Sequence, residues 1–238
     1  MKLEGITVLD LSLFLPGPAA TQIMADHGAR IIKVENPRAP EPTRSADAFP
    51  WQQGGETVMF RNTQRGKESI ALDLKTDAGK RALMALAKTV DVVVEAFRPG
   101  VAVRLGIDYA TLSRDNPRLV YCSISAFGQT GPWCDRPAHD TATVAAAGVL
   151  DVTRSPEGNA GPAIIGVPIA DMLASNLALS GILMALLRRQ TTGQGDFVDI
   201  SMFESVLAAS PNIMGPVFGG DQAPERLKER THGGNAML

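Results

Sequence analysis

The stretch ITVLDL at residues 6–11 is the first buried strand that the sequence predicts, and the fold follows from what comes after it. Residues 19–26 have the composition of a helix that stops at His27-Gly28, and RIIKVE at residues 30–35 returns as a second strand. A strand, a helix and a second strand in this order form a compact β-α-β unit.

A second unit of the same kind lies further along the chain. SIALDL at residues 69–74 and VDVVVE at residues 90–95 read as strands, and residues 77–88 between them read as a helix with one apolar face. Continuous apolar strands that alternate with helices build a parallel sheet with both faces covered. We therefore expect an α/β fold, a parallel sheet covered by helices on both faces.

The rest of the chain continues the alternation. The patterns predict helices at 108–114, 140–150, 171–189 and from 202 onward, and strands at 118–124 and 197–201. Residues 36–63 are rich in Pro, Gly and polar residues without a period, so we expect a long surface excursion that forms a flap near the functional site. Ligands of open α/β sheets bind beyond the carboxyl ends of the strands, so the loops there should carry the chemistry.

Composition and charge exclude several classes of protein. Of the 238 residues, 45% are hydrophobic and 20% charged, which is typical of a globular domain and excludes a disordered chain or a coiled coil. The net charge of −2 provides no positive field to collect nucleic acid or an anionic membrane. Two cysteines, Cys122 and Cys134, are too few for a disulfide framework, and no signal peptide is visible. We expect a reduced, cytoplasmic protein.

One apolar stretch offers an alternative. Between residues 163 and 187 the only charge is Asp171, and Arg188-Arg189 close the run as they would close a membrane span. Pro168 and Asp171 divide the stretch, and its many small residues suit a helix packed inside a protein. We favour a buried core helix over a span.

Several common active-site motifs are absent. LPGP at residues 15–18 replaces the glycine-rich loop of a dinucleotide-binding protein, and neither a P-loop nor a Gly-x-Ser-x-Gly elbow occurs. These absences disfavour a dehydrogenase, a nucleotide hydrolase and an esterase. His27, His139 and His232 lack metal-ligand spacing to acidic or cysteine partners, so we expect no metal site.

Three cations follow strand ends in the sequence. Lys75, Arg98 and Arg104 lie after the ends of predicted strands, and we expect these strands to be adjacent in the sheet. A phosphate-bearing ligand at that edge of the sheet could then contact all three cations. Each cation taken singly also fits a solvated surface residue, because Lys and Arg are mostly exposed in proteins.

Asp171 is the sharpest candidate for catalysis. It follows Gly166 and Pro168 and begins an apolar helix, so one carboxylate lies in an otherwise dry neighbourhood. Asp is a favoured N-cap residue, worth about 1 kcal/mol, so Asp171 fits a helix cap. A carboxylate there can also act as nucleophile or base, and the two roles are not exclusive. His139-Asp140 is a weaker candidate, a histidine on the loop rim with a carboxylate beside it.

An ordered set of short motifs resembles class III coenzyme A transferases, the family of formyl-CoA transferase, carnitine CoA-transferase and α-methylacyl-CoA racemase. The resemblance runs from about Leu3 to Ser205, and the ordered set is specific although each piece is not. The motifs are GITVLDL at 5–11 with Gly17-Pro18, Gly28-Ala29 with KVE at 33–35, Asn62 with RGK at 65–67, LDLK at 72–75, FRPG at 97–100, Leu105-Gly106, Asn116-Pro117 and GQTGP at 128–132.

The resemblance implies a Rossmann-like large domain, a small domain, and a homodimer of interlocked subunits. It implies no permanently bound cofactor, with coenzyme A and acyl-CoA as substrates and a carboxylic acid as acceptor. The residues that match the family's coenzyme A contacts are Leu72, Lys75, Ala96, Phe97, Arg98, Arg104 and Ala138.

The resemblance also implies a mechanism. Asp171 matches the catalytic aspartate of the transferases, which attacks the acyl-CoA and carries CoA as an aspartyl thioester to the acceptor acid. His139-Asp140 resembles the racemase branch, in which a histidine and an aspartate, here His139 and Asp171, exchange the α-proton of a 2-methylacyl-CoA. A third interpretation is a non-catalytic CoA-binding remnant.

Some positions depart from the family pattern. Asn36 stands where a basic residue is common, with Arg38 and Arg44 as substitutes nearby. Leu15 stands where formyl-CoA transferase has Gln, which argues against a formyl or oxalate enzyme.

Length bears on the domain organisation. Family members continue well beyond the 238 residues given. We expect residues 1–205 to form the CoA-binding large domain, and residues 206–238 to be a linker and the start of a truncated small domain.

Overall fold

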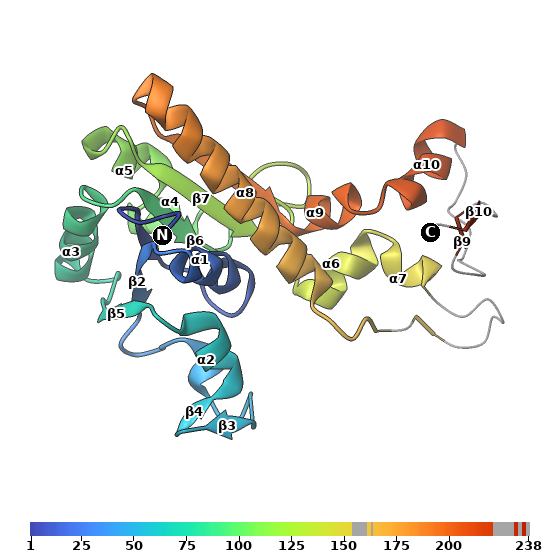
Figure 1. Ribbon diagram of the computed structural model, residues 1–238, viewed down its shortest axis with the longest axis horizontal. Coiled ribbons are helices and arrows are strands. Elements are labelled where there is room, and N and C mark those ends of the chain that lie inside the picture. Colours follow the sequence, from blue (N-terminus) through green and yellow to red (C-terminus); the bar gives the residue numbers. More distant parts are fainter. Residues whose placement is uncertain (154–160, 163, 221–230, 233–234, 237–238) are drawn as a thin grey trace.

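The core of the molecule is a parallel sheet of six strands in the order β5-β2-β1-β6-β7-β8 (Figure 1). The computed structural model describes residues 1–153, 161–162, 164–220, 231–232 and 235–236. The six strands are β1 (Thr7–Asp10), β2 (Arg30–Glu35), β5 (Glu68–Ala71), β6 (Val92–Glu95), β7 (Val120–Ser125) and β8 (Asp196–Ser201). The chain starts in the middle of the sheet, fills one edge and returns to fill the other, which is the strand order of a Rossmann fold. The predicted fold class is confirmed.

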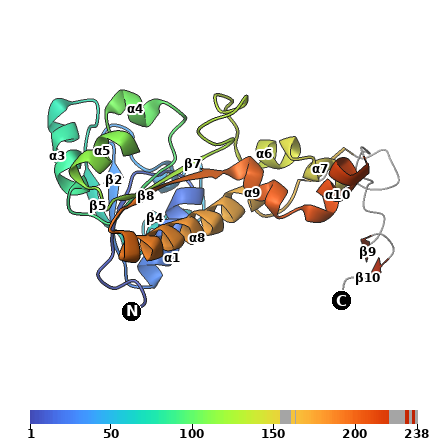
Figure 2. The same ribbon diagram turned by 90° about the horizontal axis from the view of Figure 1, so that it is seen from above.

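Helices cover both faces of this sheet, as Figures 1 and 2 show. Helices α1 (Pro16–Asp26) and α8 (Ile169–Thr192) pack on one face, and α3 (Asp77–Ala87), α4 (Val101–Leu105) and α5 (Tyr109–Asp115) on the other. Because successive strand residues point to opposite faces, Val8 joins the core under α1 and α8, whereas Leu9 joins the core under α3 and α5.

The elements that follow β7, other than α8 and β8, extend away from the sheet (Figure 2). They are α6 (Asp140–Ala146), α7 (Val149–Val152), α9 (Met202–Ala208), α10 (Pro211–Gly220), β9 (Thr231–His232) and β10 (Asn235–Ala236). The single helix predicted at 140–150 is wrong, because the chain breaks into α6 and α7 at Gly148. Gly148 has a φ of 78°, a left-handed conformation that only glycine adopts readily.

The expected excursion at residues 36–63 projects from the sheet edge, but it is not irregular. It contains the 3-10 helix η1 (Pro42–Arg44), the short strands β3 (Gln52–Gln53) and β4 (Glu56–Thr57), and the helix α2 (Val58–Gln64). Thr57 is buried and its hydroxyl caps α2 by accepting the Phe60 N–H at 3.0 Å. Because buried polar residues such as Thr57 hold this segment in place, its sequence shows no periodic pattern of apolar residues.

The strand predicted at residues 69–74 is too long. Strand β5 ends at Ala71, and the chain then turns before α3. The Asp73 carboxylate accepts the Lys75 N–H at 3.0 Å, and the Thr76 hydroxyl caps α3 by accepting from Gly79 at 3.1 Å. Leu72 to Lys75 therefore form a turn at the rim of the sheet.

Helix α8 lies along the sheet with one face buried. Residues at helical spacing on this face are fully buried, among them Ala170, Ala174, Ala178 and Ile182. This face of α8 therefore agrees with the core helix that the sequence favoured over a membrane span. The opposite face is apolar and open, with Met184 65% exposed. By length and composition alone α8 could cross a membrane, since its most apolar window has a mean hydropathy of 1.7 and is 39% buried. The expectation of no membrane contact stays a prediction.

Candidate functional site

A cavity of about 130 Å³ lies where the chain leaves β1, β2, β5 and β6 at their carboxyl ends. Its lining residues are Leu11, Leu13, Val34, Asn36, Ala39, Leu72, Asp73, Leu74, Lys75, Phe97 and Leu105. The structure thus brings together three of the predicted coenzyme A contacts, Leu72, Lys75 and Phe97, from loops that are far apart in sequence. The turn after β5 and the loop after β6 meet across the ends of β2 and β1.

The other predicted contacts lie outside this lining. Strands β5 and β6 are separated by β2 and β1, so the expectation that the three cations follow adjacent strands is wrong. Arg98 and Arg104 are exposed and belong to no ion pair among the described residues. Ala96 packs against the core, and Ala138 is half-buried two residues before the start of α6.

The two suggested substitutes for a basic residue at Asn36 differ in their placement. Arg38 is exposed and lies 3.7 Å from the carboxylate of Asp73, which lines the cavity. Arg44 instead forms an ion pair with Glu35 at 2.7 Å and lines a different cavity. Arg38 is therefore the cation that the excursion brings to the rim.

Asp171 is not the N-cap of α8, so that interpretation is wrong. Helix α8 begins after Pro168, whose side chain makes no capping hydrogen bond, and Asp171 is the third residue of the helix. The cap comes from Asp140 at the start of α6, whose Oδ1 accepts from the backbone N–H of Ala170 at 2.6 Å and of Asp171 at 3.1 Å. First-turn amides have no partner within their own helix, so a carboxylate from another helix satisfies them.

The electrostatics of the pair follow from this geometry. Burial raises the pKa of Asp171 from 3.8 to about 6, and the negative charge of Asp140 adds to the rise. The side chain of Asp171 is half-buried and has no hydrogen-bond partner among the residues described. Asp171 is thus an uncommitted carboxylate that is still ionised at neutral pH and more basic than an exposed aspartate.

His139 lies next to Asp140 and contacts a loop that the sequence did not single out. Its exposed ring meets the ring of Phe14 edge to face, with the centroids 6.2 Å apart. Phe14 has a φ of 62°, which is rare for a bulky residue. Its N–H donates to Glu41 Oε1 at 3.0 Å, and this buried acceptor helps to hold the left-handed backbone.

The loop after β1 connects the two parts of the site. Leu11 and Leu13 line the cavity, and Phe14 comes next and touches His139. Neither Phe14 nor Glu41 could be found from the sequence, because no glycine marks the positive φ and Glu41 lies in a stretch without periodicity. Within the described residues, no three His, Cys, Asp or Glu side chains are grouped to hold a metal.

Comparison with known proteins decides the family. A sequence profile described as CoA-transferase family III matches residues 3–237. This chain belongs to CoA-transferase family III. Family members similar to it include the acetyl-CoA:oxalate CoA-transferase of Acetobacter aceti, 37% identical over 95% of this chain and 57% of the relative. The succinate–glutarate CoA-transferase of Agrobacterium fabrum is 37% identical over 89% of this chain and 54% of the relative.

A solved structure agrees with the family. A CaiB/BaiF family protein from Brucella suis superposes with a TM-score of 0.88 at 33% identity, over 96% of this chain and 60% of that one. This chain of CoA-transferase family III therefore spans little more than half the length of the relatives it matches.

Proposed function

We propose that this chain is the CoA-binding, nucleophile-carrying part of a transferase that moves coenzyme A between an acyl-CoA and a carboxylic acid. The observation that carries the proposal is Asp171, a half-buried carboxylate with a pKa of about 6 at the start of α8, whose first-turn amides are capped by another residue. The names of relatives that act on succinate and glutarate support dicarboxylic acids of this class as acceptors. Another relative acts on oxalate, but Leu15 argues against oxalate for this chain.

The chemistry needs a carboxylate that is ionised when it attacks the thioester and that can be released again at the end of the reaction. The Asp171 carboxylate would attack the thioester carbonyl, and the CoA thiolate would leave to give a mixed anhydride. The thiolate would then attack the Asp171 carbonyl, releasing the donor acid and forming an aspartyl-CoA thioester. The acceptor carboxylate reverses both steps to form the new acyl-CoA and free Asp171. Positive backbone dipoles at the start of α8 favour the negative charge that develops in these steps.

The proposal assigns the cavity at the strand ends to the nucleotide part of coenzyme A. Apolar Leu72 and Phe97 offer surfaces for a base, and Lys75 offers a cation for a phosphate. The exposed Arg98 and Arg104 lie in the loop and helix that follow β6, and they would approach the phosphates only once the ligand is bound.

The decisive experiment is mass spectrometry after the protein is incubated with acetyl-CoA, succinyl-CoA or glutaryl-CoA and trapped with borohydride or hydroxylamine. We expect a covalent change at Asp171, because an aspartyl thioester is reduced by borohydride and captured by hydroxylamine. Asp171→Asn should show no change, and Asp47→Asn, at an exposed loop position, should behave as the unaltered protein. An unmodified Asp171 with every acyl-CoA would refute the covalent mechanism.

A second candidate is racemisation of a 2-methylacyl-CoA. It is favoured by His139, which adjoins Asp140 at the α6 end that caps α8. Two acid–base groups on opposite faces of an α-carbon suffice for inversion. This function predicts α-deuterium uptake from D₂O that is lost in His139→Ala. Coenzyme A binding without either adduct or exchange would instead favour a non-catalytic CoA-binding protein.

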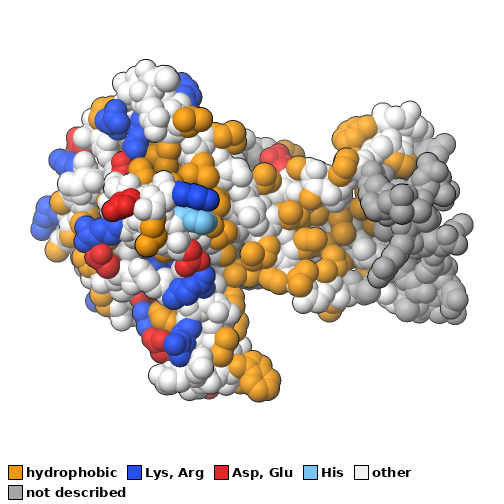
Figure 3. Space-filling view, in the orientation of Figure 1, with side chains coloured by type: hydrophobic (Ala, Val, Ile, Leu, Met, Phe, Trp, Pro, Cys, Tyr) orange, Lys and Arg blue, Asp and Glu red, His pale blue; other side chains and the backbone are white. Residues whose placement is uncertain are grey.

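We propose in addition that the protein works as a homodimer with interlocked subunits in the cytoplasm. The exposed apolar face of α8 supports a partner, since Leu177, Met184 and Leu187 are 43%, 65% and 67% exposed. Figure 3 shows hydrophobic side chains gathered where α8, α6 and α7 meet. Sedimentation velocity of the protein and of Met184→Lys tests this; a monomer at all concentrations would contradict the dimer.

A further inference from the structure

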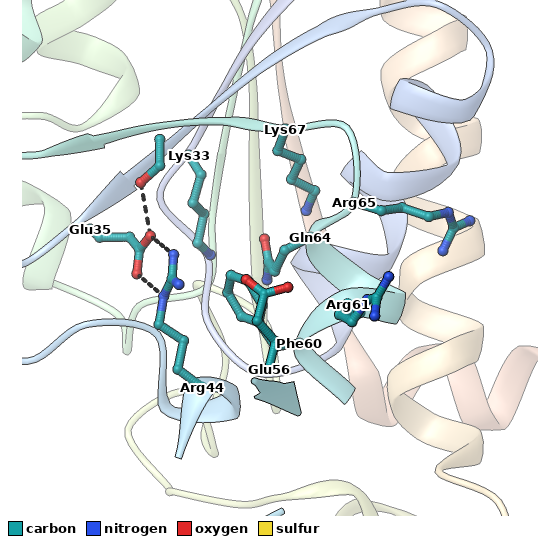
Figure 4. A pocket seen from close by; sticks show the side chains of 10 residues that line it. Lys33, Glu35, Arg44, Glu56, Phe60, Arg61, Gln64, Arg65 and Lys67 are labelled. Atoms are coloured by element: carbon teal, nitrogen blue, oxygen red, sulfur yellow. Dashed lines mark hydrogen bonds and ion pairs between the residues drawn. The ribbon is translucent and has the colours of Figure 1, made fainter. Parts of the chain in front are cut away.

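A second and larger cavity, of about 400 Å³, lies on the other face of β2 (Figure 4). Its lining residues are Lys33, Glu35, Arg44, Glu56, Phe60, Arg61, Gln64, Arg65, Lys67 and Ser69. Lys33 and Glu35 point away from the strand face that carries Val34, which lines the smaller cavity. A volume of this size lies in the range of small-molecule sites, about 300–1,000 Å³.

The charges around this cavity are arranged unevenly. The lining includes five cations and two carboxylates. One of these carboxylates, Glu35, is already saturated, because it accepts from Nε and Nη2 of Arg44, from the Ser69 hydroxyl and from the Glu41 N–H. Four of the five cations pair with carboxylates, because Lys33, Arg44, Arg65 and Lys67 contact Glu41, Glu35, Asp26 and Asp10 respectively. Among the described residues this leaves Arg61 as the lining cation without a carboxylate partner, and Glu56 as the lining carboxylate with free acceptor capacity.

The two lysines at the cavity are buried close to each other. Lys33 Nζ lies 3.0 Å from Glu41, and Lys67 Nζ donates to Asp10 at 3.1 Å and to Thr21 at 2.8 Å. Burial lowers the pKa of Lys67 despite the Asp10 carboxylate, and the positive charge of Lys33 lowers it further. An anion in the cavity would relieve the repulsion between these two ammonium groups.

Gln64 is the feature that points to a ligand. It is 93% buried, and neither its amide nitrogen nor its amide oxygen has a hydrogen-bond partner among the described residues. Figure 4 shows the amide directed into the space between Lys33 and Lys67. Leaving a buried amide without partners costs about 1–3 kcal/mol, so a group that pairs with it would bind favourably.

Arg61 is a second group at this cavity that could bind a ligand. Its Nη1 donates to the Gln53 carbonyl at 3.1 Å, and within the part of the chain that the structure describes it forms no ion pair with a carboxylate. A guanidinium offers a planar fork of donors that matches the two oxygens of a carboxylate.

We propose that this cavity binds a small organic dicarboxylate, with one carboxylate accepting from the Gln64 amide beside the two lysines and the other from Arg61. A guanidinium fork donates to carboxylate and phosphate oxygens alike, but Glu56 at the cavity disfavours a compact dianion such as phosphate over a dicarboxylate whose two charges are separated. The site is separate from Asp171, so a dicarboxylate here is a ligand of the large domain and not the acceptor under attack.

The test is a titration of the protein with sodium succinate, by calorimetry and by thermal unfolding, against sodium chloride of equal ionic strength. We expect saturable binding and a rise in Tm, because a ligand that binds only the folded state stabilises it. Gln64→Leu and Arg61→Gln should each weaken succinate binding about tenfold, equivalent to about 1.4 kcal/mol. Gln64→Leu should also raise the Tm without ligand, since it removes the unpaired amide.

Three controls separate this site from the proposed catalysis. Arg81→Gln changes the same charge at an exposed position of α3 and should leave binding unchanged. Asp171→Asn should also bind succinate as the unaltered protein does, whether or not Asp171 forms adducts. No saturable binding, binding lost in Asp171→Asn but kept in Gln64→Leu and Arg61→Gln, or equally tight binding of inorganic phosphate would each overturn the proposal.

Discussion

Replacement of Asp171 by Asn should stabilise the folded protein at neutral pH while it removes the proposed nucleophile. The folded protein holds a proton on Asp171 more tightly than the unfolded chain, because the pKa rises from 3.8 to about 6 on folding. The free energy of unfolding therefore falls as the pH rises through this window, and the penalty is complete above about pH 6. Asn carries no charge and pays no such penalty.

The size of the effect follows from the pKa. A rise from 3.8 to about 6 corresponds to about 3 kcal/mol at about 1.36 kcal/mol per pKa unit. The side chain is only half-buried, and the dipole of α8 favours the charged form by about 0.3–1 kcal/mol, so we expect a gain of ~1–2 kcal/mol.

Urea unfolding followed by tryptophan fluorescence measures this gain at about pH 4 and about pH 8, on either side of the titration. The gain of Asp171→Asn should be close to zero at the lower pH and full at the higher. Asp47→Asn, in an exposed loop, should change stability equally at both. An Asp171→Asn gain that is the same at both pH values would show that burial and Asp140 do not penalise the carboxylate.

Three further substitutions test the surroundings. Asp140→Asn keeps an oxygen to cap α8 but removes the charge, so the acid limb of the pH profile of Asp171 adduct formation should move to lower pH; an unmoved limb would contradict the coupling. Arg189→Met removes the guanidinium that binds the carboxylate of Asp91, the residue before β6, at 2.8 Å and should lower the free energy of unfolding in urea by about 2–3 kcal/mol; a loss below about 0.5 kcal/mol would show that this ion pair contributes little. Gly79→Ala places a Cβ 2.1 Å from the Asp73 carbonyl oxygen and so displaces the turn at the smaller cavity. It should weaken coenzyme A binding several-fold by calorimetry; an unaltered affinity would show that this turn does not contact the nucleotide.

Much of the fold could be predicted from the sequence because its strands are continuous apolar runs. The strand of residues 30–35 is predicted and found with the same bounds, since a central strand is buried on both faces. The prediction fails where polar contacts decide: the Asp73 turn shortens β5, and Gly148 divides a helix whose composition is uniform.

The candidate site was predictable only in its parts. Asp171 could be singled out as a lone carboxylate in an apolar stretch, but its actual position in α8 depends on Asp140, 31 residues earlier. No local pattern predicts that one helix is capped by another. Phe14 and Gln64 were missed for a similar reason, since a positive φ and an unpaired amide arise from tertiary structure.

Helix α8 is held by side-chain contacts at both ends, and under the proposed function this limits how an acyl group could be selected. Asp140 holds the first turn, and in the last turn the Arg189 guanidinium donates to the Asp91 carboxylate at 2.8 Å and to the Arg118 carbonyl at 3.0 Å. A carboxylate on a helix held at both ends cannot shift its position to suit thioesters of different length or branching. If Asp171 is the nucleophile as proposed, discrimination among acyl groups would come from the walls that bring the thioester to a fixed carboxylate, and substrate range could be altered there without rebuilding α8.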